Sequence, residues 1–229
     1  MISLLLQRMK SAQHSSNGTP TRLLLVSQPA TPGLPSIPAA RTETAKVKEM
    51  MEKENIELSL IEDGAATIAR VKEGMGAYSW LHFVCHAVQD LVDPLKSGLY
   101  VHDGRLELLE IMKQRIQHAD HVFLSSCQSG QGDEALADEV VHLAAGMLAA
   151  GYRGVIAATW SISDIYASEI AEGFYRHILD AQLEETAEWR LDSTRAAYAL
   201  DHSIQQIREK LGDSEEGLLA WVPYVHFGI

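Results

Sequence analysis

The sequence predicts an α/β protein with a largely parallel sheet, and three observations support this fold class. Apolar runs that are too short for helices alternate along the chain with segments whose apolar residues recur at helical spacing. Strands that alternate with helices are joined by right-handed crossovers, which place the strands parallel to one another. A chain of 229 residues is also long enough to bury one sizeable core. We therefore expect one α/β domain.

The first half of the chain supplies three of the expected strands. We expect residues 1–20, which end in a turn-rich stretch, to form a flexible tail or the end of an upstream region. The prolines between residues 29 and 38 predict a loop, because proline fixes φ and removes a backbone donor. The periodicity predicts strands at residues 21–27, 56–61 and 79–87, and helices at residues 42–54 and 65–75.

The second half begins with a predicted β-hairpin and then returns to the alternating pattern. Asp103-Gly104 lies between alternating apolar residues of segment 98–108, which is a strong hairpin signal. We expect this small hairpin to lie beside the edge of the sheet where ligands bind. Further strands are predicted at residues 120–127, 154–160 and 221–227, and helices at residues 109–117, 136–148, 164–180 and 194–211.

Composition and charge exclude several classes of protein. The formal net charge of −12 argues against a nucleic-acid surface, which needs a basic patch. The chain has no run approaching the roughly 18 consecutive apolar residues of a membrane-spanning helix. Its two cysteines cannot make a disulfide framework, and the apolar run in the first ten residues is too short for a signal peptide. We therefore expect a cytoplasmic protein with neither nucleic acid nor membrane as a partner.

Two predicted strands carry the residues that indicate chemistry, His86 and Cys127. The carboxyl ends of parallel strands meet at one edge of an open sheet, and ligands bind in the crevice beyond that edge. An imidazole beside a thiol can keep the sulfur ionised and later protonate a leaving amine, as thiol-based acyl transfer requires. His86 is therefore the candidate general acid and Cys127 the candidate nucleophile. The alternative interpretation of Cys127 is a small buried core residue.

Four segments, taken together, resemble the CHAT domain family, which is caspase-like and related to the separases. They follow the family's order and spacing, and they are residues 79–87, 124–130, 138–146 and 154–164. The resemblance covers roughly residues 21–229 and implies a caspase-like three-layer α/β/α sandwich with a His86/Cys127 peptidase dyad. It further implies a cysteine endopeptidase that acts on protein or peptide substrates. A peptidase in the cytosol requires a switch, so we also expect an activating partner or upstream region.

The resemblance implies roles for two further residues near the dyad, Ala87 and Asp164. Family members have glycine after the catalytic histidine, whereas this chain has Ala87. The backbone N–H groups of Ala87 and Cys127 would hold the oxyanion, provided that φ at Ala87 suits a residue with a Cβ atom. By its resemblance to the separase branch, Asp164 would form the floor of a pocket for a basic side chain, unless it only caps the helix beginning nearby. Ser125 and Gln128 are further candidates for substrate binding.

Several alternatives stay open at this point. The first is a caspase-like domain without turnover that docks partners in a regulatory or immune-type assembly, and the second is a small-molecule enzyme on a flavodoxin-like sheet. A metal site at His82, Cys85 and His86 is disfavoured, because alternate residues of a strand face opposite sides. A disulfide between Cys85 and Cys127 competes with a buried structural thiol at Cys85. We expect no cofactor and no metal.

Overall fold

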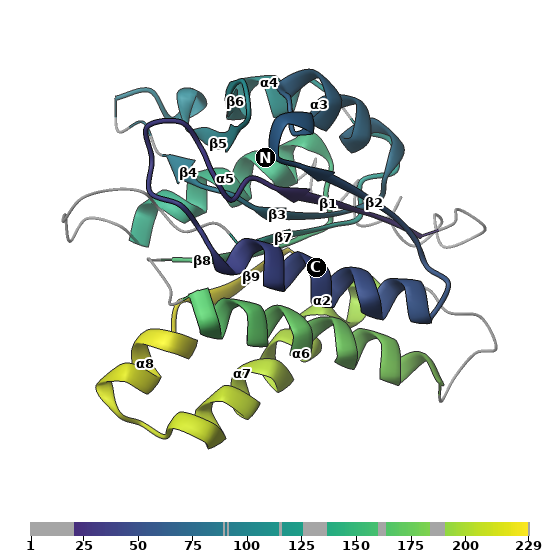
Figure 1. The fold of residues 1–229 in the computed structure, drawn as a ribbon, viewed down its shortest axis with the longest axis vertical. Helices are drawn as coiled ribbons and strands as arrows, with labels where there is room; N and C mark the ends of the chain where they lie inside the picture. Colours follow the sequence, from purple (N-terminus) through teal and green to yellow (C-terminus); the bar gives the residue numbers. More distant parts are fainter. Residues whose placement is uncertain are drawn as a thin grey trace, which may run out of the picture.

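A six-stranded sheet lies between two layers of helices in this computed structural model (Figure 1). The structure describes residues 21–88, 90, 92–114, 116–125, 137–159, 164–183 and 191–228. The strand order is β2-β1-β3-β7-β8-β9, and only β9 runs antiparallel to its neighbour. The strands are β1 (Arg22–Ser27), β2 (Glu57–Glu62), β3 (Trp80–Val84), β7 (His121–Leu124), β8 (Gly154–Ala158) and β9 (Tyr224–Gly228). The predicted α/β fold with a largely parallel six-stranded sheet is confirmed.

The central strands are buried on both faces, which explains why they appear in the sequence as continuous apolar runs. All five residues of β3 and all five of β8 are buried. Leu23, Leu24, Leu25 and Val26 of β1 have no exposed surface. The sheet therefore forms the middle of the hydrophobic core, and its helices complete that core on two sides.

Helices cover both faces of the sheet, as a three-layer sandwich requires. One apolar layer joins the sheet to α2 (Ala39–Lys53), α6 (Asp164–Leu183) and α7 (Ala196–Leu211). The other joins it to α3 (Ile68–Ala77), α4 (Leu108–Lys113) and α5 (Ala137–Ala150). Figure 1 shows α2, α6 and α7 below the sheet and α3 and α4 above it. The caspase-like α/β/α layering is confirmed.

A second, three-stranded antiparallel sheet stands beside the end of β3. The predicted hairpin is present as β5 (Gly98–Val101) and β6 (Gly104–Glu107), and Val101 pairs with Gly104 across the turn. Gly104 has a φ of 148°, which a residue with a Cβ atom rarely adopts. The short strand β4 (Ala87–Val88) adds to this hairpin, although the sequence analysis expected residues 79–87 to form a single strand. The chain therefore leaves the main sheet at the position of His86.

Several boundaries differ from the sequence-based expectations. The segment expected to begin the last strand ends a short helix instead, α8 (Glu215–Trp221), and β9 starts after Pro223. Helix α4 ends at Lys113 rather than at residue 117, and β7 ends at Leu124 rather than at residue 127. Three short 3-10 helices complete the connections, η1 (Asp63–Ala65), η2 (Pro94–Lys96) and η3 (Ser193–Arg195). The expected tail at residues 1–20 lies outside the described residues.

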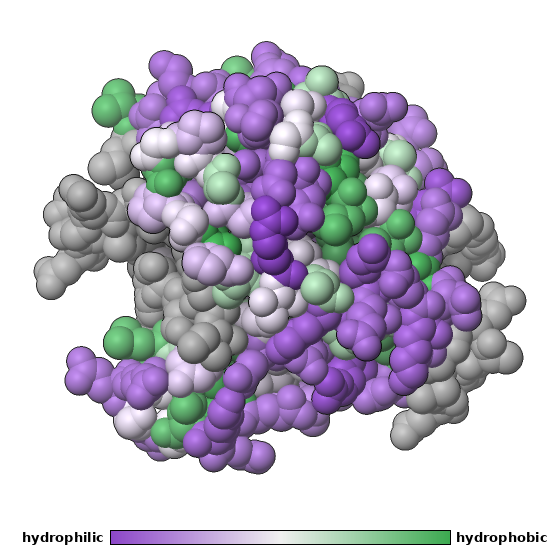
Figure 2. Space-filling view, in the orientation of Figure 1, coloured by the Kyte–Doolittle hydropathy of each residue, from purple (hydrophilic) through white to green (hydrophobic). Residues whose placement is uncertain are grey.

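The described helices and one face of the surface show how apolar residues are distributed. No helix in the described ranges is both long and apolar enough to cross a bilayer. Hydrophilic residues cover most of the face drawn in Figure 2, and apolar residues interrupt them in small areas. Isolated apolar residues of this kind are normal on a protein surface.

Candidate active site

The candidate site lies at the carboxyl ends of the neighbouring strands β3 and β7. These strands are parallel, and their register pairs Phe83 with Leu124 near the end of each. Ser125 directly follows β7, and its N–H donates to the carbonyl of Phe83 at 2.9 Å. His86 lies two residues beyond the end of β3. The structure thus brings His86 and Ser125 to the same edge of the sheet, as predicted, whereas Cys127 and Gln128 lie outside the described residues.

The imidazole of His86 is buried and has one nitrogen tied to the backbone. Only 5% of the residue is exposed, and Nε2 lies 2.7 Å from the carbonyl oxygen of Pro35. A carbonyl can only accept, so Nε2 must carry the proton that is donated. Nδ1 is buried and has no hydrogen-bond partner among the described residues. In the neutral ring, Nδ1 is therefore the atom with a lone pair, available to exchange a proton with a nearby group.

The Pro35 carbonyl is held in place by the loop that the prolines predicted. Within this loop the N–H of Ile37 donates to the carbonyl of Pro29 at 2.8 Å. The side chain of Ile37 packs with Ala40 and Val84 in a small buried apolar cluster. The sequence analysis identified the loop but not this role, because any residue type can offer a backbone carbonyl.

Ala87, where the family has glycine, has an ordinary backbone conformation. Within the described residues, the non-glycine residues with positive φ are Asn55 and Asp63, so Ala87 is not among them. The N–H of Tyr100 donates to the carbonyl of His86, which makes Ala87 and Leu99 a non-hydrogen-bonded pair of the antiparallel ladder. The N–H of Ala87 therefore points away from β5. The Cβ atom introduces no left-handed strain at this position.

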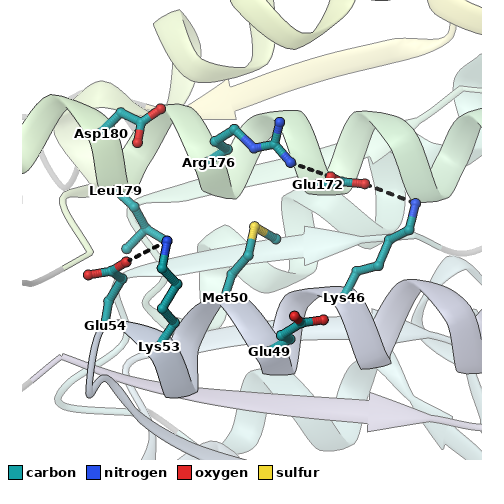
Figure 3. A pocket seen from close by; sticks show the side chains of 9 residues that line it. All are labelled: Lys46, Glu49, Met50, Lys53, Glu54, Glu172, Arg176, Leu179 and Asp180. Carbon is teal, nitrogen blue, oxygen red and sulfur yellow. Dashed lines mark hydrogen bonds and ion pairs between the residues drawn. The ribbon is translucent and has the colours of Figure 1, made fainter.

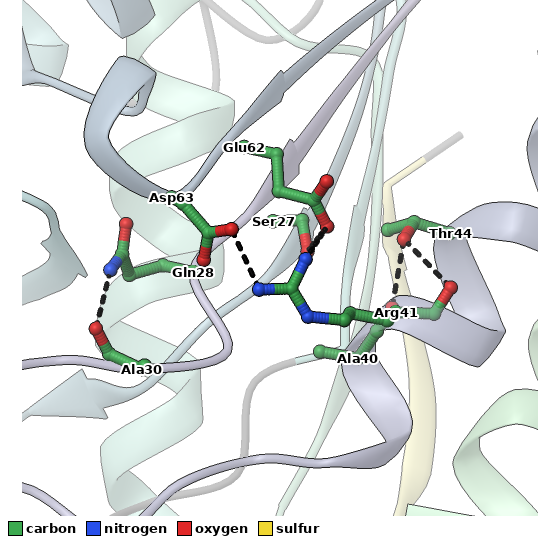
Figure 4. Close-up of polar contacts among 8 residues, drawn as sticks. All are labelled: Ser27, Gln28, Ala30, Ala40, Arg41, Thr44, Glu62 and Asp63. Atoms are coloured by element: carbon green, nitrogen blue, oxygen red, sulfur yellow. Dashed lines mark hydrogen bonds and ion pairs between the residues drawn. The ribbon is translucent and has the colours of Figure 1, made fainter.

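Other polar groups at the same edge also have buried atoms without a hydrogen-bond partner among the described residues. The predicted substrate-binding residue Ser125 is 4% exposed, and its hydroxyl is one of them. Gln28 and Thr31, which follow β1, supply two more through Oε1 and Oγ1. The side-chain N–H of Gln28 donates to the carbonyl of Ala30 at 2.7 Å (Figure 4). The sequence analysis missed Gln28 and Thr31. The only indication in the sequence was that these polar residues come shortly after the apolar run of β1.

Asp164 is the first residue of α6, which begins six positions after the end of β8. Because β8 neighbours β7 in the parallel part of the sheet, the start of α6 lies toward the same edge as His86. The side chain of Asp164 lies outside the described part of the structure. The backbone is thus compatible with both predicted roles, a specificity pocket and a helix cap.

The residues considered for a metal site face different surroundings. His82 is fully buried and lies 2.9 Å from the carboxylate of Glu43. Cys85 is also buried, but it belongs to the apolar layer on the side of α3 and α5. No group of three or more potential metal-ligating side chains occurs in the described ranges.

A separate pocket of about 380 Å³ lies between α2 and α6 (Figure 3). Met50 and Leu179 contribute apolar surface, and charged side chains line the rest. Glu172 is paired with both Lys46 and Arg176, while Lys53 lies 3.7 Å from Glu54. Most of the lining charge is therefore compensated within the pocket, and its residues belong to the middle and end of α2 and α6 rather than to the sheet edge.

Comparisons with known proteins agree with this architecture. The model of the family described as the CHAT domain matches residues 2–228. A crystal structure of the Arg-specific cysteine proteinase gingipain R (RgpB) is similar with a TM-score of 0.62 and 11% identity, over 98% of this chain and 51% of that chain. A complex of the RgpB pro- and mature domains from Porphyromonas gingivalis gives a TM-score of 0.61 and 10% identity, over 96% and 51% of the two chains. No curated protein sequence matches the chain.

These two solved structures share the caspase-like fold with this chain. At such low identity the likeness concerns the fold alone. The chain spans about half the length of either neighbour.

Proposed function

This chain belongs to the CHAT domain family, and we propose that it is a cysteine endopeptidase whose dyad is His86 and Cys127. One observation carries the proposal: His86 has Nε2 bonded to the Pro35 carbonyl and a buried, unpartnered Nδ1 at the end of β3. The neighbouring strand β7 ends three residues before Cys127. A ring held in this way is oriented to share a proton with a thiol delivered by that strand.

The proposed reaction uses the chain's own groups for each step. The Cys127 thiolate attacks the carbonyl carbon of the scissile bond, and the backbone N–H groups of Ala87 and Cys127 donate to the oxyanion. The His86 imidazolium gives its Nδ1 proton to the leaving amine as the C–N bond breaks, which leaves an acyl-enzyme. Water then attacks the thioester while His86 takes up a proton from it. The C–S bond then breaks, which regenerates the Cys127 thiolate beside the His86 imidazolium and releases the carboxylic acid product.

The proposal extends to substrate choice and regulation. Asp164 would accept the basic side chain preceding the scissile bond, with Ser125 and Gln128 lining the approach. One structural neighbour is an Arg-specific cysteine proteinase, which is compatible with a pocket for a basic side chain in this fold. The other neighbour is a complex of pro- and mature domains. For this chain, we propose regulation by a partner or upstream region and a location in the cytoplasm.

A comparison of wild type with Cys127→Ala tests the nucleophile. We expect wild type to cleave peptides from a library and the variant to leave all of them intact. Both proteins should melt within a few degrees of each other, because deleting a sulfur at the edge of a sheet removes little packing. Residual turnover in Cys127→Ala would contradict the proposed nucleophile, and loss of the fold would identify Cys127 as a core residue. An intact wild type without turnover would favour the alternative of a partner-docking domain.

A further inference from the structure

Three successive contacts hold segment 35–43 against one face of β3 and against His86, which lies beyond the end of that strand. Alternate residues of a strand share a face, so His82 and Val84 both point toward this segment. The contacts, in order, are His86 with Pro35, Val84 with Ile37 and Ala40, and His82 with Glu43. The segment therefore runs antiparallel along β3, from the catalytic edge into the interior.

The interior end of this row is a buried polar pair. His82 has no exposed surface and Glu43 is 2% exposed, and the ring N–H donates to the carboxylate at 2.9 Å. The His82 ring packs against Phe123 and stacks on Tyr175, with ring centroids 4.8 and 5.6 Å apart. Burial, together with the nearby Glu43 charge, holds the pKa of Tyr175 well above its ordinary value. Glu43 thus lies fixed among rings of the sheet and α6.

A need for stability alone does not explain this pair. Two well-packed apolar residues of similar volume are often as stable as a buried ion pair, because burying charge is unfavourable. A charged hydrogen bond differs from an apolar contact in having a preferred direction and length. The pair therefore fixes the position of α2 on β3 more narrowly than an apolar contact would.

Apart from the apolar contact of Ile37 and Ala40 with Val84, the other restraints on the start of α2 are weak. The helix has no side-chain cap, since Pro38 occupies the N-cap position, and no acidic residue lies in its first turn. Arg41 reaches Glu62 at 3.2 Å and Asp63 at 2.7 Å, and Figure 4 shows its guanidinium between the two carboxylates. More than half of the Arg41 side chain is exposed, so solvent screens these ion pairs. The buried bond to Glu43 is the stronger restraint.

We infer that Glu43 and His82 are positioning residues for His86. Their bond holds α2 and the loop before it, and the loop holds the Pro35 carbonyl against Nε2 of His86. The catalytic ring thereby keeps its proton on Nε2 and presents Nδ1 to the thiol. The catalytic consequence rests on the proposed dyad, whereas the effect on the His86 tautomer does not.

Two readouts on the full chain separate positioning from stability. NMR of the histidine ring nitrogens reports which nitrogen of neutral His86 carries the proton, independently of any turnover. The rate of Cys127 alkylation by iodoacetamide at about pH 6, divided by the rate at about pH 9, reports how strongly the thiolate is favoured. Mass analysis of the labelled peptide distinguishes Cys127 from Cys85.

The variants remove the bond in two ways and include a conservative replacement. Glu43→Leu fills a similar volume without an acceptor. If this variant does not fold, Glu43→Leu combined with His82→Phe also removes the buried imidazole that would otherwise lose its acceptor. Glu43→Gln keeps an acceptor for the His82 N–H. Asp120→Asn is the matched control, because Asp120 is another partly buried carboxylate that accepts from Trp80 and Ser193, but at the opposite edge of the sheet.

We expect the Nε2–H tautomer in wild type, Glu43→Gln and Asp120→Asn, and a mixture of tautomers in Glu43→Leu and the double variant. The alkylation ratio should fall about tenfold in the last two and stay within about twofold in the others.

A folded Glu43→Leu or double variant with the wild-type tautomer and ratio would overturn the inference. An equal change in Asp120→Asn would also overturn it, by showing that any loss of stability has this effect. His86→Ala tests the dyad itself: if its ratio equals that of wild type, the proposed function fails, and the tautomer still decides the inference.

Discussion

Two buried histidines at opposite edges of the sheet, His86 and His121, have very different surroundings. His86 has one nitrogen bonded to the Pro35 carbonyl and the other without a described partner. His121 is fully buried and neither of its nitrogens has a partner in the described part of the chain. It packs between aromatic rings, with Trp80 at 4.7 Å and Phe174 at 5.8 Å. Burial alone therefore does not mark a functional histidine. His86 differs from His121 in having one bonded and one unpartnered nitrogen at the carboxyl ends of the parallel strands.

The surroundings of His121 favour its neutral form. Burial, and to a smaller extent His226, hold the pKa of His121 well below its ordinary value of 6.5. The ring has room only because residue 154 is glycine, since a Cβ atom there would lie 2.7 Å from Nδ1 of His121. The histidine at the N-terminal edge of the parallel sheet is thus a packed ring, whereas His86 at the other edge is the proposed proton carrier.

Substitution of either histidine tests this contrast, and here we expect the largest effect. His86→Ala should lower kcat/KM by about 10²–10⁴-fold, as expected for the loss of a general acid. His86→Asn should not restore activity, because an amide cannot shuttle the proton. His121→Leu should leave kcat/KM within a few-fold of wild type. Equal losses of turnover in folded His86→Ala and His121→Leu proteins would remove the distinction between the two edges.

Substitution in the proposed pocket for a basic side chain should give the next largest effect. Asp164→Asn preserves size and capping ability but removes the charge, so it should weaken transition-state binding of Arg and Lys substrates by about 1–3 kcal/mol. Substrates with a neutral residue before the scissile bond should be cleaved at nearly the wild-type rate. Kinetics on paired peptides that differ only at this residue provide the measurement. Unchanged selectivity in the variant would assign Asp164 to helix capping.

His121, at the opposite edge of the sheet, should make the free energy of unfolding depend on pH. The folded pKa of His121 is lowered, so its contribution to stability is complete above about pH 6.5 and is lost as the pH falls below that value. Below pH 6.5 the unfolded chain gains a proton that the folded chain excludes, which lowers the free energy of unfolding by up to about 1.4 kcal/mol per pH unit. His121→Leu should flatten this slope in urea titrations at several pH values. An equal slope in both proteins would show that His121 is not the responsible group.

Ala87 gives the smallest expected effect. Its φ is not positive, so replacement by the family's glycine relieves no strain and only adds flexibility to the unfolded chain and to the loop. We expect Ala87→Gly to lower activity slightly and stability by less than about 1 kcal/mol. Steady-state kinetics with thermal melts provide the comparison. A clear rise in activity would show that the Cβ atom does hinder the oxyanion site.

The sequence predicted the strands that are buried on both faces, because such strands appear as continuous apolar runs. The apolar runs at β1, β3 and β8 had to be buried on both faces, so their positions and their parallel arrangement followed from the pattern alone. Helix α8 was missed because it has only seven residues, too few to show a helical period. The position of His86 near the carboxyl ends of the parallel strands was predicted from its place at the end of an apolar run.

The partners of the histidines could not be predicted in the same way. The Pro35 carbonyl has no sequence signature, since every residue has one. Glu43 stood among the charged residues of an amphipathic helix, where an exposed position was the simplest interpretation. Its burial against His82 depends on how α2 crosses β3, which is a property of the tertiary structure.

Labelling of Cys127 by an acyloxymethyl ketone peptide with Arg next to the reactive group tests the central claim most directly. Reaction requires a nucleophilic thiol, an oriented histidine and an accessible edge of the sheet at the same time. We expect wild type and His121→Leu to be labelled at Cys127, and His86→Ala and Cys127→Ala to remain unlabelled. An inert Cys127 in folded wild type, or undiminished labelling in His86→Ala, would contradict the proposed dyad.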